Sequence, residues 1–536
     1  MKQNRSRRFI TGAASMAISA VFGYAEPAAS QPVSLTPAAM PRIGSVDERY
    51  QSYNVEMLEV TGGRFWRPYG PGLEAALRQP APASSGGDTP GGMNPGLYEY
   101  RPPIDLTNAR LRKLAAALGP AYVRVSGTWA NTTYFPETDQ ASADPPAGFG
   151  GVLTHQQWQG VIDFSKAVDA RIVTSFATGV GTRDAAGVWT SGQAKRFLDY
   201  TTSHGGGIAA AEFMNEPNVA AMGGAPEGYD AADYGRDFKI FDAFARQAAP
   251  DMQILGPGSV GEAAADWAIA SAYGSAPILK TRDLLAASEP AHVDAFSYHH
   301  YGAASRRCAP ISQTTPEEAL TEDWLGRTDE TLAFYRKLRD EFEPGRPFWV
   351  TETADAACGG NPWAGTFLDS FRYLDQLGRL ARQDVRVVLH NTLVASDYGL
   401  LDDETLEPKP NYWAALLWRR LMGRTVLDSG VPIREGLHLY AHCLRGTPGG
   451  VALLAINNSP TRSTSISLPT GADRYTLTAG QLESRDVRLN GRELRLGTND
   501  QLPDLQGSRV PPGSAELAPA SITFLQLADA GNRSCR

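Results

Sequence analysis

The sequence predicts an α/β protein, a (β/α)8 TIM barrel followed by a C-terminal antiparallel β-sandwich domain. Its 536 residues are too many for one ordinary domain and suit a large barrel with a smaller partner. From about residue 50, short apolar segments alternate with amphipathic helical patterns, and after about Thr425 only short strands and turns follow. We expect the barrel over 45–424 and the sandwich over 425–536, which a strand from 31–44 joins.

Eight apolar segments are expected to form the barrel strands, because strands covered on both faces are short and apolar throughout. In chain order they are 55–60, 121–125, 171–176, 208–214, 252–256, 293–298, 347–351 and 385–390. The alternative architecture is an open doubly wound sheet. It is disfavoured because no glycine-rich phosphate-binding loop opens any of the intervening helices.

Apolar residues at helical spacing separate most of these segments. Leu111, Leu114 and Leu118 form one such stripe, and longer ones run over 367–381 and 412–421. A strand that is regularly followed by a helix is what a parallel barrel requires.

The last hundred residues predict an antiparallel β domain. The expected strands are 437–443, 450–457, 463–468, 474–478, 487–489 and 521–527. Asn490-Gly491 predicts a tight hairpin between the strand that ends at Leu489 and residues 493–496. Turn residues between short strands favour a sandwich.

The first thirty residues have the pattern of a signal peptide. Four basic residues within 2–8 precede an apolar run over 9–22, and 28–30 (Ala-Ala-Ser) offers small residues for cleavage. The run is too short to stay in a membrane. Residues 6–10 also resemble a twin-arginine signal, so both export routes remain open. We expect a periplasmic or secreted protein, and no later stretch predicts a membrane helix.

Composition narrows the functional classes. Hydrophobic residues make up 42% and charged residues 20% of the chain, which indicates a folded core. The net charge of −8 is opposite to that of a typical nucleic-acid-binding protein, so no nucleic-acid partner is expected. Cys308, Cys358, Cys443 and Cys535 suit two disulfides in an oxidising compartment, or free buried thiols. Their long spacing argues against a zinc site.

Two glutamates at predicted strand ends are the strongest catalytic candidates, because barrel active sites lie at the C-terminal ends of the strands. Glu216 follows the fourth strand in the motif Asn215-Glu216-Pro217-Asn218, and Glu352 follows the seventh strand. An acid and a carboxylate on either side of one bond are what glycoside hydrolysis requires. We assign Glu216 as general acid/base and Glu352 as nucleophile, with Asn215 bonded to the sugar 2-hydroxyl.

Histidines and tyrosines after the sixth strand are further candidates. In Tyr298-His299-His300-Tyr301, two histidines flanked by two tyrosines are expected to bind sugar and to orient the nucleophile. No third ligand lies at a suitable spacing, so no metal site is predicted. Arg124, at the end of the second strand, would hold a catalytic carboxylate ionised or pair with a structural one.

These motifs resemble those of glycoside hydrolase family 79, the heparanase and β-glucuronidase family of retaining (β/α)8 enzymes. The similarity covers most of the mature chain. The matching positions are Leu111-Arg112, Leu118, Pro120-Ala121-Tyr122, Arg124, Gly127-Thr128, Asn215-Glu216-Pro217-Asn218, Asp294, Ser297, His299-His300-Tyr301, Glu352-Thr353, Cys358-Gly359-Gly360, Asp397-Tyr398, Pro410-Asn411-Tyr412-Trp413, Tyr440-Ala441-His442-Cys443, Leu489-Asn490-Gly491 and Leu502-Pro503.

The resemblance implies retaining β-glucuronidase chemistry. The family holds the C6 carboxylate of its substrate with backbone N–H groups of a glycine-rich loop and with a tyrosine, and those roles fall on Cys358, Gly359 and Tyr398. Cys358 stands where the family has a glycine, although a backbone donor survives that change. Tyr301 takes a position beside the nucleophile, and Thr128 takes one that touches the sugar.

The resemblance also implies two disulfides, Cys443–Cys535 and, with it, Cys308–Cys358. Glu56 is similar in position to an acidic residue on the first strand of the family.

We therefore expect an exported retaining β-glucuronidase that releases glucuronic acid or 4-O-methylglucuronic acid from polysaccharide or glycoside chain ends. The acidic charge argues against heparan sulfate. No cofactor is implied, because carboxylates and water suffice. The expected partner is a carbohydrate with a terminal uronic acid, and the protein is expected to be a monomer or a simple homo-oligomer.

Two alternatives remain at this point. One is a neutral-sugar β-glycosidase of the same clan, a β-xylosidase or β-glucosidase. The other is a non-catalytic polysaccharide-binding protein, which would require the loss of a catalytic glutamate.

Overall fold

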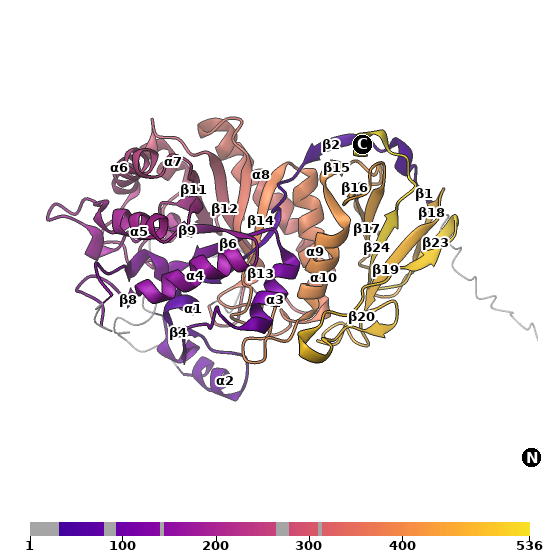
Figure 1. Cartoon of the computed structure of the whole chain (residues 1–536), viewed down its shortest axis with the longest axis horizontal. Helices are drawn as coiled ribbons and strands as arrows, with labels where there is room; N and C mark the ends of the chain where they lie inside the picture. The colour runs from indigo at the N-terminus through magenta and orange to yellow at the C-terminus, as the bar shows by residue number, and fades with distance from the viewer. Residues whose placement is uncertain (1–31, 80–92, 140–143, 264–277, 309–312) are drawn as a thin grey trace, which may run out of the picture.

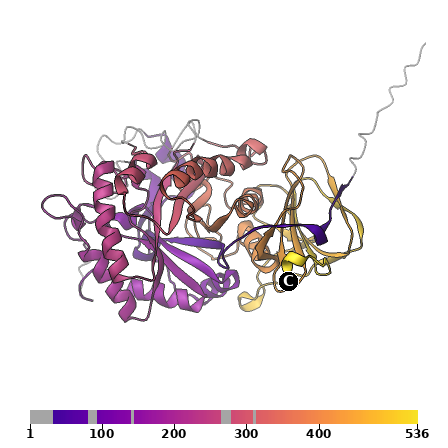
Figure 2. The ribbon, with the colours of Figure 1, turned by 90° about the horizontal axis from the view of Figure 1, so that it is seen from above.

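The computed structural model describes residues 32–79, 93–139, 144–263, 278–308 and 313–536, and the predicted signal peptide (1–30) lies outside these ranges. Figure 1 shows a barrel of strands and helices beside a smaller unit of strands, with α9 (Phe367–Arg382) and α10 (Pro410–Leu421) between them. Figure 2 shows the N-terminal segment running along the smaller unit before it enters the barrel.

Eight parallel strands close into the predicted barrel. They are β3 (Gln51–Glu56), β6 (Ala121–Ser126), β9 (Ala170–Ser175), β10 (Ile208–Glu212), β11 (Gln253–Val260), β12 (Ala295–Ala304), β13 (Phe348–Ala357) and β14 (Val385–His390). Around the barrel the order is β10-β11-β12-β13-β14-β3-β6-β9, so that each strand pairs with its neighbour in the chain. The expected (β/α)8 fold is confirmed.

Helices cover the outside of the barrel. They are α3 (Ala109–Leu118), α4 (His155–Ala167), α5 (Gly192–Ser203), α6 (Ala231–Ala248), α7 (Thr281–Ser288), α8 (Glu322–Phe342), α9 and α10. Nearly every residue of α9 is buried, because the barrel covers one side of this helix and the smaller unit covers the other. Among the described residues, no helix is both long and apolar enough to cross a membrane.

The first barrel strand differs from its prediction over 55–60. It runs over 51–56, and the next five residues form α1 (Met57–Thr61). The reason is a capping box: Glu59 accepts the backbone N–H of Glu56 and starts a helix there. The apolar residues of 57–60 are therefore buried on a helix instead of a strand.

Two sheets form the C-terminal unit. The larger contains β2 (Arg42–Ser45), β15 (Met422–Leu427), β16 (His438–Leu444), β17 (Val451–Asn457), β24 (Ser521–Leu527), β19 (Ala472–Thr478), β20 (Arg488–Leu489), β21 (Arg492–Glu493) and β22 (Ser508–Val510). The smaller contains β1 (Val33–Ser34), β18 (Thr464–Leu468) and β23 (Gly513–Leu517). Apolar residues of both sheets enclose a second core. The Cys443–Cys535 disulfide joins β16 to the chain end.

A charged cluster joins the barrel helices to the larger sheet. His438 of β16 is buried between Asp375 of α9 and Glu322 of α8, and each of its ring nitrogens lies 2.5 Å from a carboxylate oxygen. Burial alone would lower the pKa of His438, but Asp375 and Glu322 raise it to about 9. The charged imidazolium therefore holds the two units together at neutral pH.

We expect His438→Gln to destabilise the protein by about 3 kcal/mol at pH 6. The folded pKa lies above the unfolded value, so the stabilisation is complete below about pH 6.5 and is lost as the pH rises through about 9. Thermal unfolding from pH 6 to 10 measures this. His442→Gln on the same strand is the matched control, because burial lowers the pKa of His442 to about 4. A difference between wild type and His438→Gln that does not shrink with pH would contradict the assignment.

Candidate active site

A cavity opens at the C-terminal end of the barrel strands. Its lining residues come from six strand ends and the loops beside them: Glu56, Trp66, Met93, Gly127, Thr128, Trp129, Glu216, Met222, Tyr301, Glu352, Ala357, Cys358, Asn391 and Tyr398. The fold thus brings both predicted catalytic glutamates to one cavity, together with the predicted sugar-binding residues Thr128, Tyr301, Cys358 and Tyr398.

The floor of this cavity is a polar layer above an apolar one. Side chains alternate along each strand, so residues two apart stand above one another. The apolar layer includes Tyr122, Ala210, Ala295 and Trp349, and two residues further along the same strands come Arg124, Glu212, Ser297 and Thr351. On each of these strands, the inward side chains change from apolar core residues to polar site residues within two positions.

Arg124 connects this polar floor to the cavity. Its guanidinium is fully buried and donates to Glu212 Oε2 at 2.8 Å and to Glu352 Oε2 at 2.9 Å. Burial alone would raise the pKa of Glu212, but Arg124 and His299 hold it well below its usual range. The sequence left two roles open for Arg124, and the structure shows both contacts. Arg124 binds Glu352, which lines the cavity, and it also pairs with Glu212, which does not.

Glu352 extends from β13 into the cavity and is 6% exposed. Besides the ion pair with Arg124, its Oε1 accepts the hydroxyl of Tyr301, which lies on β12. The two oxygens of Glu352 are thus each held by one donor. These two contacts fix the orientation of the Glu352 carboxyl group.

Glu216 lies on the other side of the same cavity. It follows β10 with a φ of 50°, and its Oε1 lies 2.9 Å from His299 Nδ1. Burial raises the pKa of Glu216, the negative charge of Glu352 raises it further, and His299 opposes both. Oxygen atoms of Glu216 and Glu352 lie within 4.8 Å of each other. One cavity therefore contains a carboxyl that favours its proton beside a carboxylate bound to arginine.

His299 is fully buried between the acidic residues. Burial alone would lower its pKa, but Glu352, Glu212 and Glu216 raise it to about 9, against the opposing charge of Arg124. Two cations, Arg124 and His299, thus lie among the carboxyl groups of Glu212, Glu216 and Glu352.

Asn215 is fixed by a residue that the sequence analysis missed. Its backbone N–H donates to Asn131 Oδ1, and its carbonyl oxygen accepts from Asn131 Nδ2, each at 2.9 Å. Arg124 occupies the side-chain oxygen of Asn215 at 2.8 Å. Asn131 therefore fixes the backbone of Asn215, immediately before Glu216. In the sequence, only the position of Asn131 in the loop after the second strand indicates this role.

A second missed residue, Asn391, lies at the end of β14. Its Nδ2 is 3.1 Å from Glu56 Oε1, 3.0 Å from the Tyr301 oxygen and 3.1 Å from the Tyr398 oxygen. Because an N–H faces the Tyr301 oxygen, the Tyr301 proton is directed to Glu352. Asn391 thus links both predicted tyrosines.

Glu56 is a third carboxyl in the cavity, as the family resemblance suggested. Burial raises its pKa well above the usual range, and the charge of Glu352 adds to this. A Cβ on Gly127 would lie 1.7 Å from Glu56 Oε2, and Gly127 has a φ of 95°. Only glycine fits at this position, which explains the Gly127-Thr128 motif.

The turn after β13 carries the predicted carboxylate-binding positions. Cys358 and Gly359 both have positive φ, and so does Gly360. Cys358 is bonded to Cys308, as the resemblance implied. Cys358 lines the cavity directly, whereas Gly359 does not belong to its lining.

The histidine-tyrosine prediction is wrong for two of its four residues. His299 and Tyr301 face the site, but alternation along β12 turns Tyr298 and His300 to the outside. His300 Nδ1 lies 2.9 Å from Thr331 Oγ1 of α8, and burial with nearby arginines lowers its pKa to about 3. Tyr298 stacks on a tyrosine of the same helix.

Among the described residues, the only group with potential metal ligands in place is Glu216, His299 and Glu352. These atoms already have partners, since Arg124 binds Glu352 and a His299 with a pKa near 9 is protonated at neutral pH. An imidazolium has no lone pair for a metal. The donor set therefore suits proton transfer better than metal binding.

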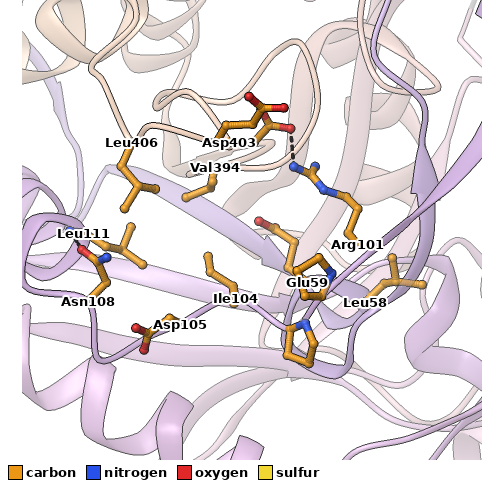
Figure 3. A pocket seen from close by; sticks show the side chains of 13 residues that line it. Leu58, Glu59, Arg101, Ile104, Asp105, Asn108, Leu111, Val394, Asp403 and Leu406 are labelled. Carbon is orange, nitrogen blue, oxygen red and sulfur yellow. Dashed lines mark hydrogen bonds and ion pairs between the residues drawn. The ribbon is translucent and has the colours of Figure 1, made fainter. Parts of the chain in front are cut away.

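A second cavity is lined by side chains that include Leu58 and Glu59 of α1 (Figure 3). It contains the ion pair of Arg101 with Asp403, and Glu59 (Figure 3). Burial raises the pKa of Glu59 to about 7, and its oxygens accept the backbone N–H groups of Glu56 and Ala395. Its lining also includes Asp105 and Glu404, and Glu59, through its bonds to Glu56 and Ala395, supports the wall of the first cavity.

Comparisons with known proteins agree with this geometry. The profile of "Glycosyl hydrolase family 79, N-terminal domain" matches residues 103–378. Heparanase-like protein 1 of Arabidopsis thaliana is 27% identical over 81% of this chain and 86% of its own. Hyaluronoglucuronidase of Hirudo nipponia is 26% identical over 82% and 93%. The crystal structure of a 4-O-α-L-rhamnosyl-β-D-glucuronidase from Fusarium oxysporum covers 92% of this chain and 100% of its own, with a TM-score of 0.60 and 12% identity, and shows the shared fold.

Proposed function

Because the chain belongs to glycosyl hydrolase family 79, and so is a glycoside hydrolase, we propose that it is an exported retaining β-glucuronidase. Its substrate would be a glycoside or polysaccharide with a terminal glucuronic acid or 4-O-methylglucuronic acid. The observation that carries the proposal is the pair Glu216 and Glu352, two carboxyl groups in one cavity with opposite environments.

In the first step, Glu352 attacks the anomeric carbon while Glu216 donates its proton to the leaving oxygen. In the second step, Glu216 takes a proton from water, which displaces Glu352. Oxygens within 4.8 Å suit the separation of about 5–5.5 Å found in retaining enzymes, and inverting enzymes need about 6.5–9.5 Å. Arg124 and Tyr301 stabilise the carboxylate that leaves in this step.

The uronic-acid preference rests on the turn at Cys358 and Gly359 and on Tyr398, whose hydroxyl faces the cavity network. The names of the relatives, a heparanase-like protein and a hyaluronoglucuronidase, support the same sugar class. Thr128 and the NH2 group of Asn215 would bind sugar hydroxyls. Export is supported by the N-terminal pattern and by two disulfides, which persist in oxidising compartments.

The test compares 4-nitrophenyl β-D-glucuronide, β-D-glucoside and β-D-xyloside with the purified protein. We expect kcat/KM for the glucuronide to be at least about 10²-fold higher, because a site built for a polar group rejects analogues that lack it. Proton NMR of the first product should show β-glucuronic acid, the retained anomer. A preference for glucoside or xyloside would instead identify a neutral-sugar β-glycosidase.

A further inference from the structure

A buried arginine lies directly behind the turn formed by 358–360. Arg307 follows β12, and its side chain is fully buried. Its Nη1 donates to the carbonyl oxygens of Cys358 and Gly360, each at 3.1 Å. Its Nη2 lies 2.5 Å from Asp397 Oδ2. One side chain therefore holds two of the three carbonyl groups of this turn.

Two further hydrogen bonds hold carbonyl groups of the turn. Ser305 Oγ also donates to the carbonyl of Cys358 at 2.8 Å, and the backbone N–H of Asp397 donates to that of Gly359 at 3.2 Å. In a planar trans peptide the N–H points opposite to the C=O. The N–H group of Gly359, which shares a peptide with the Cys358 carbonyl, is therefore directed away from Arg307, and it donates to no other residue within the described part of the chain. The N–H group that shares a peptide with the Gly360 carbonyl is that of Asn361, and it donates to Asp355 Oδ2 at 2.9 Å.

Two cationic side chains lie behind the turn. Arg307 and Lys409 are both buried, and Lys409 donates to the carbonyl of Asp397 at 3.2 Å. Asp397 pairs directly with Arg307, and Asp402 and Asp403 also interact with Lys409. The other buried carboxyl at the turn, Asp355, has its pKa raised to about 7 by burial and by Asp369.

We propose that Arg307 is a specificity-determining positioning residue. It directs the N–H group of Gly359 in the 358–360 turn toward the substrate, and its charge favours a C6 carboxylate over a C6 hydroxyl. The inference rests on the proposed function and extends it to a residue outside the cavity wall. The Cys308–Cys358 disulfide joins the segment of Arg307 to the same turn, so both ends of the contact are held.

The test measures kcat and KM of Arg307→Gln and Arg307→Lys on 4-nitrophenyl β-D-glucuronide and β-D-glucoside. We expect Arg307→Gln to lower kcat/KM for the glucuronide about 100-fold, mostly through KM, and to change that for the glucoside less than about threefold. Arg307→Lys keeps the positive charge but loses the planar guanidinium that donates to two carbonyl groups at once. Its loss of kcat/KM for the glucuronide should therefore be intermediate. Arg306→Gln is the matched control, because Arg306 is 42% exposed and pairs with Glu74 on the surface.

Several outcomes would overturn the inference. A glucuronide-to-glucoside ratio that stays within about threefold of wild type in Arg307→Gln would do so, and so would an equal loss on both substrates, which indicates a structural role only. If Arg307→Gln does not fold, an unchanged ratio in Arg307→Lys decides against it. Product inhibition by glucuronic acid and glucose replaces the ratio if the glucoside is not turned over. A wild type that prefers the glucoside would contradict the proposed function before any variant is made.

Discussion

Replacement of Glu352 by glutamine is expected to reduce kcat by about 10⁴-fold or more, because the covalent step loses its nucleophile. The amide keeps the shape of the side chain, so Arg124 and Tyr301 still contact it, but it cannot attack the anomeric carbon. The loss should appear in kcat with little change in KM. Steady-state kinetics with 4-nitrophenyl β-D-glucuronide measures it.

Glu74→Gln is the control for this variant. Glu74 is an exposed glutamate that pairs with Arg306, so its loss should leave kcat unchanged. The thermal midpoint of Glu352→Gln should stay close to that of wild type. More than about 1% of wild-type kcat in a folded Glu352→Gln protein would exclude Glu352 as the nucleophile.

The loss of Glu216 is expected to depend on the leaving group. Glu216→Ala should lower kcat/KM by about 10²- to 10⁴-fold on alkyl or saccharide glucuronides, whose oxygens need a proton to depart. With a 2,4-dinitrophenyl leaving group the first step needs no acid, and hydrolysis of the intermediate becomes limiting. Sodium azide should then restore turnover, because azide attacks the intermediate without a base.

The product of that rescue identifies the mechanism. β-Glucuronyl azide shows that azide entered the site of the missing acid/base on the face opposite Glu352. An equal loss on good and poor leaving groups, or an α-azide, would be incompatible with the assigned role of Glu216.

Much of the barrel could be predicted because the apolar composition of its strands reflects their burial on both faces. Buried parallel strands are short and apolar, and seven of the eight expected segments overlap β6 and its successors, although β12 and β13 each end six residues later than expected. The first strand was placed too late, because the apolar residues after Glu56 look the same in a strand and in a short helix. Hydrophobicity alone does not separate the two, and the hydrogen bond from Glu59 decides between them.

In the smaller C-terminal unit, too, local sequence patterns do not predict every strand or its pairing. Strand β2, from the start of the chain, pairs with β15, which follows α10 almost four hundred residues later. Strands β15, β22 and β23 were not predicted, because short half-exposed strands have weak patterns. Their stability comes from the neighbours they pair with.

The candidate catalytic residues were also predictable only in part. Glu216 and Glu352 could be identified because each stands in a motif at a strand end, and barrel topology brings such ends together. His300 was misassigned because a strand alternates its side chains, and the register that turns His299 inward is a property of the closed sheet. Asn131 and Asn391 stand in no motif, and only the chain around them makes them partners of Asn215 and Tyr301.

The sequence by itself therefore determined the class of fold and the two carboxyl groups, since these follow from local composition and motif spacing, and its motifs carried the resemblance to the family. The tertiary structure alone decided the surroundings of these carboxyl groups. A pKa depends on burial and on charges within a few ångströms, and Arg124, His299 and Glu212 reach Glu216 and Glu352 only when the barrel closes. The same holds for Arg307, whose contacts with the turn at Cys358 join segments about fifty residues apart.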